Sequence, residues 1–420
     1  MKVVVIGSGL IGATAAYFLA CRGYEVSVFD RQDGPGRETS FANGALLHPS
    51  MPEPWNTPGC WRVLLRSLYR SDTALKLRLR SLPDMAGWGV TFLRNSAPET
   101  FERNTLSNLR LARYSLEVMH SQRHQWNLEY GRIAVGSLRI FRDPRAMVQA
   151  LASANRRLSE GLRFRRLSSA EVIQLEPALA STAGQLVGGI HYESDEIGDA
   201  YRFCVALVSL AQRLGATFHF GTDVLALERR GDRVTAAVSK HGRFEADSYV
   251  VAAGSYSRFL LRQLDIGLPI RPAKGYSVTF NNCPDDSRSL SIPIIDDQLH
   301  AAMVPLANTI RVAGTAEFAG YDVSLRAERV RNLTTLLKTV LPQSQFDAAS
   351  ARPWCGLRPM SADGVPIIGC TAFENLWVST GHGHLGWTMA AGSGQLLTDL
   401  MSGDRPPKID AAPYALTRFA

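Results

Sequence analysis

The chain has 420 residues, of which 45% are hydrophobic and 20% charged. This composition excludes a disordered or collagen-like chain and a small disulfide scaffold, and the length favours two or more domains. The net charge of +8 is compatible with nucleic acid, anionic lipid or an anionic cofactor and substrate.

The cysteines and the apolar runs narrow the class of protein further. Six cysteines are scattered without a Cys-x-x-Cys pair, which is typical of reduced cytosolic thiols and argues against a metal site. The first apolar run stops at Gly7, too soon for a secretory signal, so we expect the mature chain to start here. No run of about eighteen apolar residues could span a bilayer. We therefore expect a cytoplasmic protein, either soluble or lying on the inner face of the membrane.

The first thirty residues predict a β-α-β unit. A β-branched run at residues 3–6 is typical of a buried strand, and residues 13–22 have the composition of a helix. A second strand is expected at residues 24–29, ending at Asp30. Such a unit begins a parallel sheet.

The turn between the first strand and the helix carries Gly7, Gly9 and Gly12, a Gly-x-Gly-x-x-Gly pattern. Glycines at these places allow a tight turn, close approach of the backbone to a pyrophosphate, and packing of the helix on the strand. Asp30 lies where a carboxylate accepts hydrogen bonds from ribose hydroxyls. The pattern indicates FAD or NAD rather than NADP, with a plain strand–helix turn as the alternative.

Beyond residue 200, helix and strand signals alternate, and glycine turns end several of them. A helix is expected over residues 200–213 and another from about Trp387. Strands are expected at residues 216–220, 224–227, 233–239, 243–246, 249–253 and 376–379.

Two stretches with longer helices and alternating strands, such as 276–280, indicate a second domain. The predicted fold class is α/β, with a Rossmann-like dinucleotide-binding domain interleaved with an α+β, mixed-sheet substrate domain. The first domain is assigned residues 1–50, 197–262 and 351–420, and the second residues 51–196 and 263–350.

Motifs along the whole chain resemble the D-amino-acid oxidase-like flavoproteins, and among these the bacterial D-amino-acid dehydrogenases. They are Thr-Ser-Phe-Ala-Asn-Gly at 39–44, Val-Val-Ala-Ala-Gly-Ser at 250–255, the run 354–366 with Gly-Leu-Arg-Pro, and the run 380–388 with Gly-His-Gly. The resemblance implies an enzyme with non-covalent FAD. In sarcosine-oxidase relatives a cysteine of this C-terminal run tethers the flavin, but Gly356 stands at that position here, with Cys355 one residue away.

The resemblance also implies which residues surround FAD. At the pyrophosphate, ribose and adenine these are Gly7, Ser8, Gly9, Ile11, Gly12, Asp30, Arg31 and Val224. Near the flavin they are Ser40, Asn43, Gly44, Ala253, Gly254, Gly381, Gly383, Leu385, Gly386, Trp387 and Thr388. A loop and helix N-terminus at the pyrimidine end would stabilise the negative charge of a reduced flavin.

Arg358 is the residue expected to bind substrate, because a guanidinium stays charged and binds a carboxylate bidentately. Tyr276 could close the site through its hydroxyl, although a strand tyrosine of the core is the alternative. His384 or His382 could act as a base, but a histidine between glycines is often held by the backbone. If the hydride leaves Cα when the substrate amine is already neutral, the reaction needs no protein base, and orientation of the substrate by Arg358 suffices.

The expected reaction is oxidative deamination of D-amino acids to imino and 2-oxo acids, with electrons passed to a quinone-type acceptor. Residues 44–50 and His384 depart from the dehydrogenase pattern, which leaves D-hydroxyproline or another secondary amine open as substrate. An oxygen-using glycine- or sarcosine-type oxidase and a subunit that is inactive without partners stay open as well.

Residues 61–80 predict a basic amphipathic helix. Trp61, Leu64, Leu65 and Leu68 recur at helical spacing among arginines, Lys76 and the single acid Asp72. Such a helix could lie on anionic lipid, which suits an enzyme that reduces a membrane quinone; an ordinary helix with a solvated basic face is the alternative. No aromatic residues interleave with base-reading ones, so a nucleic-acid partner is not expected.

Overall fold

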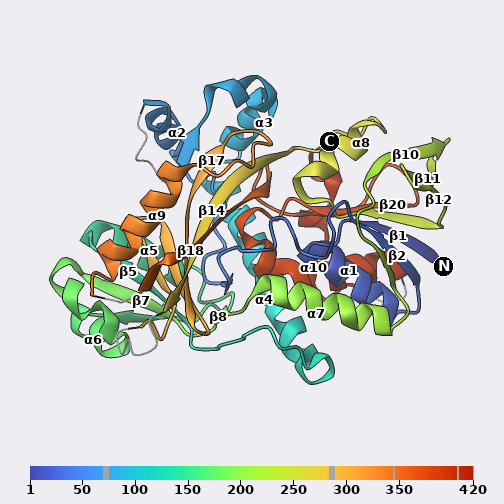
Figure 1. The fold of residues 1–420 in the computed structure, drawn as a ribbon. Helices are drawn as coiled ribbons and strands as arrows, with labels where there is room; N and C mark the ends of the chain where they lie inside the picture. The colour runs from blue at the N-terminus through green and yellow to red at the C-terminus, as the bar shows by residue number, and fades with distance from the viewer. Residues whose placement is uncertain (70–74, 283–288, 344–345, 404–405, 420) are drawn as a thin grey trace.

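The computed structural model describes residues 1–69, 75–282, 289–343, 346–403 and 406–419 (Figure 1). Within these residues two main sheets organise the molecule into two parts that lie side by side. We call them the parallel-sheet part and the large-sheet part. No helix of the described residues is long and apolar enough to cross a membrane.

The parallel-sheet part is built on the β-α-β unit that the first thirty residues predict. Among the described strands the order is β19 (Ile367–Cys370), β20 (Leu376–Thr380), β13 (Ser248–Val251), β1 (Lys2–Ile6), β2 (Glu25–Phe29) and β9 (Thr217–His219). All neighbours pair in parallel except β19, which is antiparallel to β20. This arrangement confirms the predicted α/β class.

Both faces of this sheet are covered. One face packs on helices α1 (Leu10–Cys21), α4 (Pro98–Trp126), α7 (Ala200–Arg213) and α10 (Gly386–Ser402). The other packs on α8 (Ser257–Arg262) and on an antiparallel sheet of three of the expected strands, β10 (Val224–Arg230), β11 (Arg233–Ser239) and β12 (Gly242–Phe244). Val3 and Val5 belong to the first core and Val4 and Ile6 to the second, because side chains alternate along a strand.

Helix α10 packs against α1 and α4 through glycines. A Cβ atom on Gly394 would lie 2.8 Å from the backbone carbon of Thr14, and one on Gly392 would lie 2.9 Å from the backbone of Ser115. These approaches are closer than van der Waals contact, so any side chain there would push the helices apart.

Gly394→Ala is therefore expected to lower the free energy of unfolding by about 1–3 kcal/mol, because the methyl group overpacks the α1–α10 contact. The matched control is Gly87→Ala, in an exposed helix position where an added Cβ meets nothing within 4 Å. That change is expected to stabilise by roughly 0.5–1 kcal/mol, since alanine favours helix. Chemical denaturation measures both, and a neutral Gly394→Ala would contradict the packing argument.

The large-sheet part holds a mixed sheet. Its described strands, in spatial order, are β18 (Phe346–Ser361), β14 (Ile270–Asn282), β17 (Thr309–Phe318), β16 (Ala301–Leu306), β15 (Ile294–Asp296), β5 (Ser137–Phe141), β7 (Gly188–Tyr192) and β6 (Arg165–Leu167), with β4 (Leu75–Leu77) beside β17. Helices α5 (Pro144–Asn155), α6 (Ser169–Leu175) and α9 (Ala327–Val340) lie around it (Figure 1). The remaining elements are α2 (Cys60–Tyr69), α3 (Leu82–Arg94) and the antiparallel pair β3 (Leu46–Leu47) and β8 (Glu196–Ile197).

Packing differs from the predicted domain division at two elements. Strand β18 includes residues 351–361, which we assigned to the cofactor domain, yet it pairs with β14 of the large sheet. Helix α4, assigned to the substrate domain, packs with α1 and α10 in the other core. The division into domains therefore stays a proposal. In it, β18 is grouped with the large-sheet part and α4 with the parallel-sheet part.

The single basic helix expected over residues 61–80 is wrong. Helix α2 ends at Tyr69, and β4 pairs with β17 further on because its backbone can extend the large sheet. Arg78 donates to Glu317 at 2.9 Å and Arg80 to Asp322 at 3.0 Å, so ion pairs within the protein hold these charges. The side chains of Arg66, Leu68, Arg70 and Asp72 lie outside what the structure describes.

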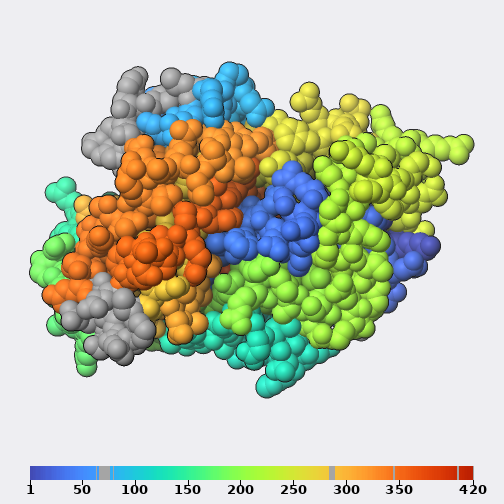
Figure 2. All heavy atoms as spheres, viewed as in Figure 1, coloured from blue at the N-terminus to red at the C-terminus, as the bar shows by residue number. Residues whose placement is uncertain are grey.

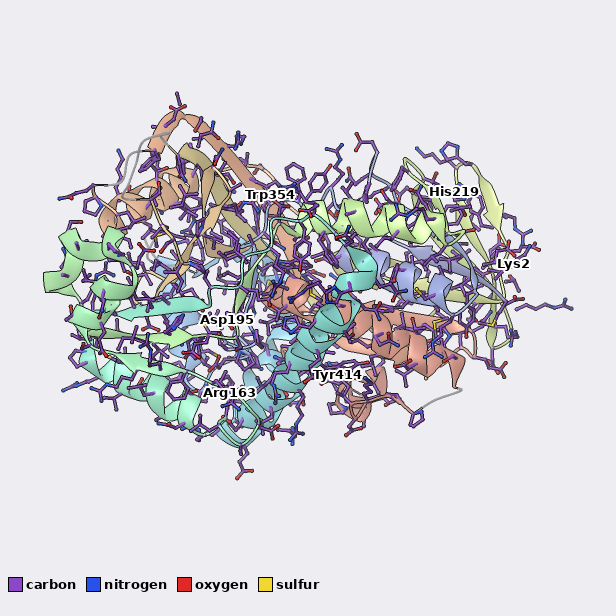
Figure 3. All side chains as sticks on the ribbon, turned by 90° about the horizontal axis from the view of Figure 1, so that it is seen from below. Lys2, Arg163, Asp195, His219, Trp354 and Tyr414 are labelled. Carbon is purple, nitrogen blue, oxygen red and sulfur yellow. The ribbon has the colours of Figure 1, made fainter. Side chains whose placement is uncertain are left out.

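A buried carboxyl group, Asp195, connects segments from both parts (Figure 3). It accepts hydrogen bonds from the hydroxyls of Ser50 and of Ser137, each at 2.5 Å. Burial raises the pKa of Asp195 to about 7, and the two hydroxyls offset only part of that shift. The protonated acid is therefore favoured more in the folded chain than in the unfolded one.

Because the folded pKa of Asp195 is raised, the stability that it contributes is present at low pH and is lost as pH rises through about 7. Asp195→Asn removes this dependence. We expect the stability of the variant relative to the parent to increase by up to about 4 kcal/mol between pH 4 and pH 8. Denaturant titrations at several pH values measure it, with the exposed Asp33→Asn as a control that should give a flat difference. A flat Asp195→Asn curve would contradict the assignment.

Candidate functional site

A cavity of about 1840 Å³ runs between the two parts of the molecule, from the glycine turn after β1 to strand β18. The blue N-terminal segment that borders it is visible between orange and green atoms in Figure 2. Most of the residues predicted to surround a cofactor line this cavity: Gly7, Gly9, Ile11, Asp30, Arg31, Ser40, Asn43, Gly44, Val224, Ala253, Gly254, Gly383, Gly386 and Trp387. Ser8, Gly12, Gly381, Leu385 and Thr388 do not line it and support the residues that do.

The glycine turn is shaped for a ligand close to its backbone. Gly7 has φ +105°, and a Cβ on it would lie 2.6 Å from the carbonyl oxygen of Ala252. A Cβ on Gly12 would lie 1.9 Å from the carbonyl oxygen of Gly7, so both positions require glycine. Gly9 lines the cavity and an added Cβ there meets only the Ser40 hydroxyl, at 3.4 Å. The open backbone at the N-terminus of α1 fits a pyrophosphate.

Asp30 braces this turn and also faces the cavity. Its Oδ2 accepts hydrogen bonds from the backbone N–H and the hydroxyl of Ser8, at 2.6 and 2.7 Å. Its Oδ1 accepts from the backbone N–H of Gln32 at 2.8 Å. The side chain of Ser8 is therefore used within the protein, whereas the half-buried Asp30 keeps acceptor capacity toward the cavity. A bond from Asp30 to a ribose stays a prediction.

At the opposite end of the cavity, β14 and β18 form a cradle of small residues. Gly275 pairs with Gly356, and Ala273 pairs with Arg358. Paired residues of antiparallel strands share one face, so these four lie on the same side of the sheet. A Cβ on Gly275 would lie 2.4 Å from the guanidinium carbon of Arg358, and one on Gly356 would lie 2.2 Å from the ring of Trp354 (Figure 3). The two glycines thus leave the space that the guanidinium and the indole occupy.

Tyr276 and Cys355 lie on the other face of these strands, because they alternate with Gly275 and Gly356. The hydroxyl of Tyr276 donates to Glu317 at 3.4 Å, and its ring belongs to the core of the large sheet. The thiol of Cys355 donates to the carbonyl of Val323 at 3.0 Å. Tyr276 therefore packs within the large sheet, although it is also among the residues that line the cavity, so that it closes the site beside Arg358 stays a prediction. Cys355 points away from the cradle.

Arg358 has a half-buried guanidinium that faces the cavity. In the described part of the chain no carboxylate lies within ion-pair distance of it and no hydrogen bond holds it. Burial lowers the pKa of Arg358 to about 10. A charge in this position attracts an anionic ligand that brings its own carboxylate.

Aromatic rings surround this arginine. Its guanidinium carbon lies 5.4 Å from the ring centre of Trp55, and Trp55 in turn stacks on His384 with ring centres 5.5 Å apart. His48 lies on the other side of His384, at 6.4 Å. Burial lowers the pKa of His48 to about 4 and that of His384 to about 3, with His48 and Arg358 adding to the effect at His384. Both imidazoles are neutral at pH 7, and neither is a strong base.

His382 has a structural contact instead. Its Nε2 lies 2.9 Å from the hydroxyl of Ser393 on α10, and burial lowers its pKa to about 3. A base that acts near neutrality needs a pKa near neutrality. The hypothesis that His382 or His384 is the base therefore gains no support.

The sequence pointed to His384 and to the segment that contains His48, but it missed Trp55 and Trp354. Both tryptophans line the cavity. Trp55 stands in residues 49–59, a stretch rich in proline whose residues match no motif for a binding site. Trp354 stands two positions before the first residue of Gly-Leu-Arg-Pro, so its place on the Arg358 face follows from strand alternation once β18 is known.

The sequence of this chain is similar to those of known enzymes. A family model described as FAD dependent oxidoreductase (DAO) matches residues 2–400. The chain is 40% identical to the D-amino acid dehydrogenase of Chromohalobacter salexigens over 422 residues, which cover 100% of both chains. It is also 40% identical to the D-amino acid dehydrogenase of Granulibacter bethesdensis, over 420 residues and 100% of both chains.

Solved structures share the fold. The glycine oxidase from Bacillus cereus aligns with a TM-score of 0.74 at 22% identity, over 97% of this chain and 96% of that one. The L-proline dehydrogenase from P. horikoshii aligns with a TM-score of 0.78 at 17% identity, over 100% of this chain and 97% of that one.

Since the half-buried guanidinium of Arg358 has no partner among the described residues, Arg358→Met is expected to raise the stability of the ligand-free protein by about 1–3 kcal/mol. The matched control is Arg157→Met. Arg157 is 1% exposed and donates to Glu53 at 2.8 Å, so its loss leaves a carboxylate unpaired and should cost about 3–5 kcal/mol. Denaturant titration of the apoprotein compares the two, and destabilisation by Arg358→Met would show that the guanidinium has a structural partner.

Proposed function

The chain belongs to the family of FAD-dependent oxidoreductases, and we propose that it is a dehydrogenase of D-amino acids. The products would be imino acids, which water converts to 2-oxo acids and ammonia. The observation that carries the proposal is the unpaired guanidinium of Arg358, at one end of a cavity whose other end is the glycine turn. In the part of the chain that the structure describes, the site has no carboxylate of its own to pair with Arg358, and an amino acid brings one.

The cofactor is FAD, which supplies the acceptor for the hydride that leaves the substrate Cα. The residues present fit it: the backbone at Gly9 is open toward the cavity, and at the far end Gly275 and Gly356 leave room for the guanidinium of Arg358 and the indole of Trp354. We propose that the glycine turn holds the pyrophosphate, with Asp30 at the ribose. The loop around Gly383 and the start of α10 would then lie at the flavin, where partial positive charge favours an anion.

The chain itself binds and orients the substrate. Arg358 would bind the carboxylate through two parallel hydrogen bonds, which fixes the Cα–H bond relative to the cradle formed by Gly275 and Gly356. His384 is neutral and weakly basic, so the amine is expected to bind after it has lost its proton to solvent. Trp55 covers one side of Arg358 and excludes water there, which strengthens the charge–carboxylate contact.

We further propose that electrons pass to a quinone-type acceptor at the inner face of the cytoplasmic membrane. The relatives at 40% identity are named dehydrogenases, which supports an acceptor other than oxygen. Trp61 and Leu65 on α2 are 49% and 51% exposed, and Arg62 beside them is exposed too, which supports contact with anionic lipid. An oxygen-using amine oxidase of the same fold is the alternative.

A second candidate substrate is D-hydroxyproline or another secondary amine. The observation that favours it is the pair His48 and His384, which line the cavity next to Arg358 at positions that depart from the dehydrogenase pattern. A secondary amino acid such as hydroxyproline also carries the carboxylate that Arg358 requires.

The test is anaerobic bleaching of the flavin absorption of the purified holoenzyme with D- and L-amino acids, D-proline, hydroxyprolines, sarcosine and glycine. We expect D-amino acids or D-hydroxyproline to bleach it and L-amino acids to leave it unchanged. Reduction by L-amino acids or glycine alone, or by none of the panel, would overturn the proposal. Rapid return of the colour in air without an added acceptor would identify the oxidase alternative.

Arg358→Lys keeps the charge but loses the planar fork. It is expected to lower kcat/KM about 30- to 1000-fold, mainly through KM, since a buried charged contact of this kind contributes about 2–4 kcal/mol. The control is Arg352→Lys on the same strand, where the exposed guanidinium donates to Asn281 at 3.1 Å. Steady-state kinetics with a dye acceptor measure both. Equal effects in the two variants would remove Arg358 from the substrate site.

A further inference from the structure

Three rings form one wall of the cavity beside Arg358. His384 lies between Trp55 and His48, with interplanar angles of 21° and 23°. The wall begins at Arg358, whose guanidinium carbon is 5.4 Å from the ring centre of Trp55. A substrate whose carboxylate is bound by Arg358 therefore has its side chain within reach of this wall.

The wall is held rigidly, because the residues on each side of Trp55 are anchored. The carbonyl of Pro52 accepts from Asn108 at 3.0 Å, Glu53 pairs with Arg157 at 2.8 Å, Pro54 packs on Gly364, and the fully buried Asn56 donates to the carbonyl of Phe92 at 3.4 Å. His48 is fixed through its backbone N–H, which donates to Thr388 at 3.1 Å. Because the wall is already ordered, ligand binding loses little conformational entropy there, and ligands are distinguished by their contacts with the wall.

His384 presents unused hydrogen-bonding capacity to the cavity. A neutral imidazole has one donor and one acceptor nitrogen. Among the described residues no hydrogen bond engages the ring of His384, in contrast to His382, which bonds Ser393. The residue lines the cavity and is half-buried, so its ring is available to a ligand that enters the cavity.

Acidic side chains on the large-sheet side of the cavity are already paired. Glu53 pairs with Arg157, Asp296 with Arg142 and Asp297 with Arg139. Within the described ranges, the substrate end thus offers no free carboxylate to a cationic side chain, and Arg358 adds a positive charge. A second positive charge on the ligand would be buried without a partner.

We propose that His384 makes the enzyme selective for amino acids whose side chain is uncharged and carries a hydroxyl group, and that cationic side chains are rejected. This inference rests on the proposed function and names its substrate class. An apolar side chain would expel water from His384 and leave its nitrogens unpaired, whereas a hydroxyl both donates and accepts. A site that hydrogen-bonds a substrate hydroxyl strongly rejects the analogue without that hydroxyl. A hydrophobic pocket rejects a substrate with an extra hydroxyl less strongly.

The experiment measures kcat/KM of the holoenzyme for pairs that differ by one hydroxyl: D-serine and D-alanine, 4-hydroxy-D-proline and D-proline. In at least one pair we expect the hydroxylated member to be preferred by about tenfold or more. D-Lysine is expected to be at least about tenfold poorer than D-norleucine, the uncharged chain of similar length. Equal values within both pairs, or a preference for D-lysine, would overturn the proposal.

His384→Phe keeps a ring in the wall and removes its nitrogens, so the hydroxyl preference should fall to about onefold, while His384→Asn should retain part of it. The control is His241→Phe, an exposed histidine on the surface, which should keep the parent's ratio. Because the readout is a ratio within one variant, partial loss of active protein does not change it. An unchanged ratio in His384→Phe would overturn the role of His384.

Failure of the proposed function gives a different result. If neither member of any pair, nor any other D-amino acid of the bleaching panel, reduces the flavin, the enzyme is not a D-amino-acid dehydrogenase and the selectivity proposal falls with it. If both members reduce the flavin equally well, the dehydrogenase stands and only the role of His384 is overturned.

Discussion

The pairing of β14 with β18 is the constraint on which the site depends. It aligns Gly275 with Gly356 and Ala273 with Arg358, and side chains of paired residues share one face. The face toward the cavity is therefore nearly free of bulk apart from the guanidinium and Trp354. The opposite face carries Tyr276 into the core of the large sheet. A shift of one residue in either strand would exchange the two sets and remove the arginine from the cavity.

Several charged side chains in and around the cavity are paired with one another. The half-buried carboxylates of Glu53 and Asp297 and the buried carboxylate of Glu317 are paired with arginines, which is how folded proteins usually accommodate charge away from water. Arg358 departs from this rule. A partner for it within the chain would stabilise the fold but would compete with a ligand's carboxylate. The unpaired arginine thus lowers the stability of the ligand-free fold but leaves the guanidinium available to a charged ligand, a compromise that is common at binding sites.

The parts of the fold that depend on local signals could be predicted. The β-α-β unit, helix α7 and strand β11 follow from apolar periodicity and turn residues, and their bounds agree with prediction to within a few residues. Residues 61–80 were mispredicted because periodicity does not reveal that β4 finds an edge to pair with at β17. For the same reason the sequence did not reveal that β18 pairs with β14 or that α4 packs with α1 and α10.

The sequence by itself determined the chemistry that is available: a glycine turn that admits a pyrophosphate, an arginine within Gly-Leu-Arg-Pro, and histidines in two segments far apart in the chain. Only the tertiary structure decided which of them meet. It brought Trp55, His48 and His384 into one wall beside Arg358 and packed the ring of Tyr276 in the core of the large sheet. The physical reason is that local patterns fix which side of a strand a residue occupies, whereas long-range pairing fixes what that side faces.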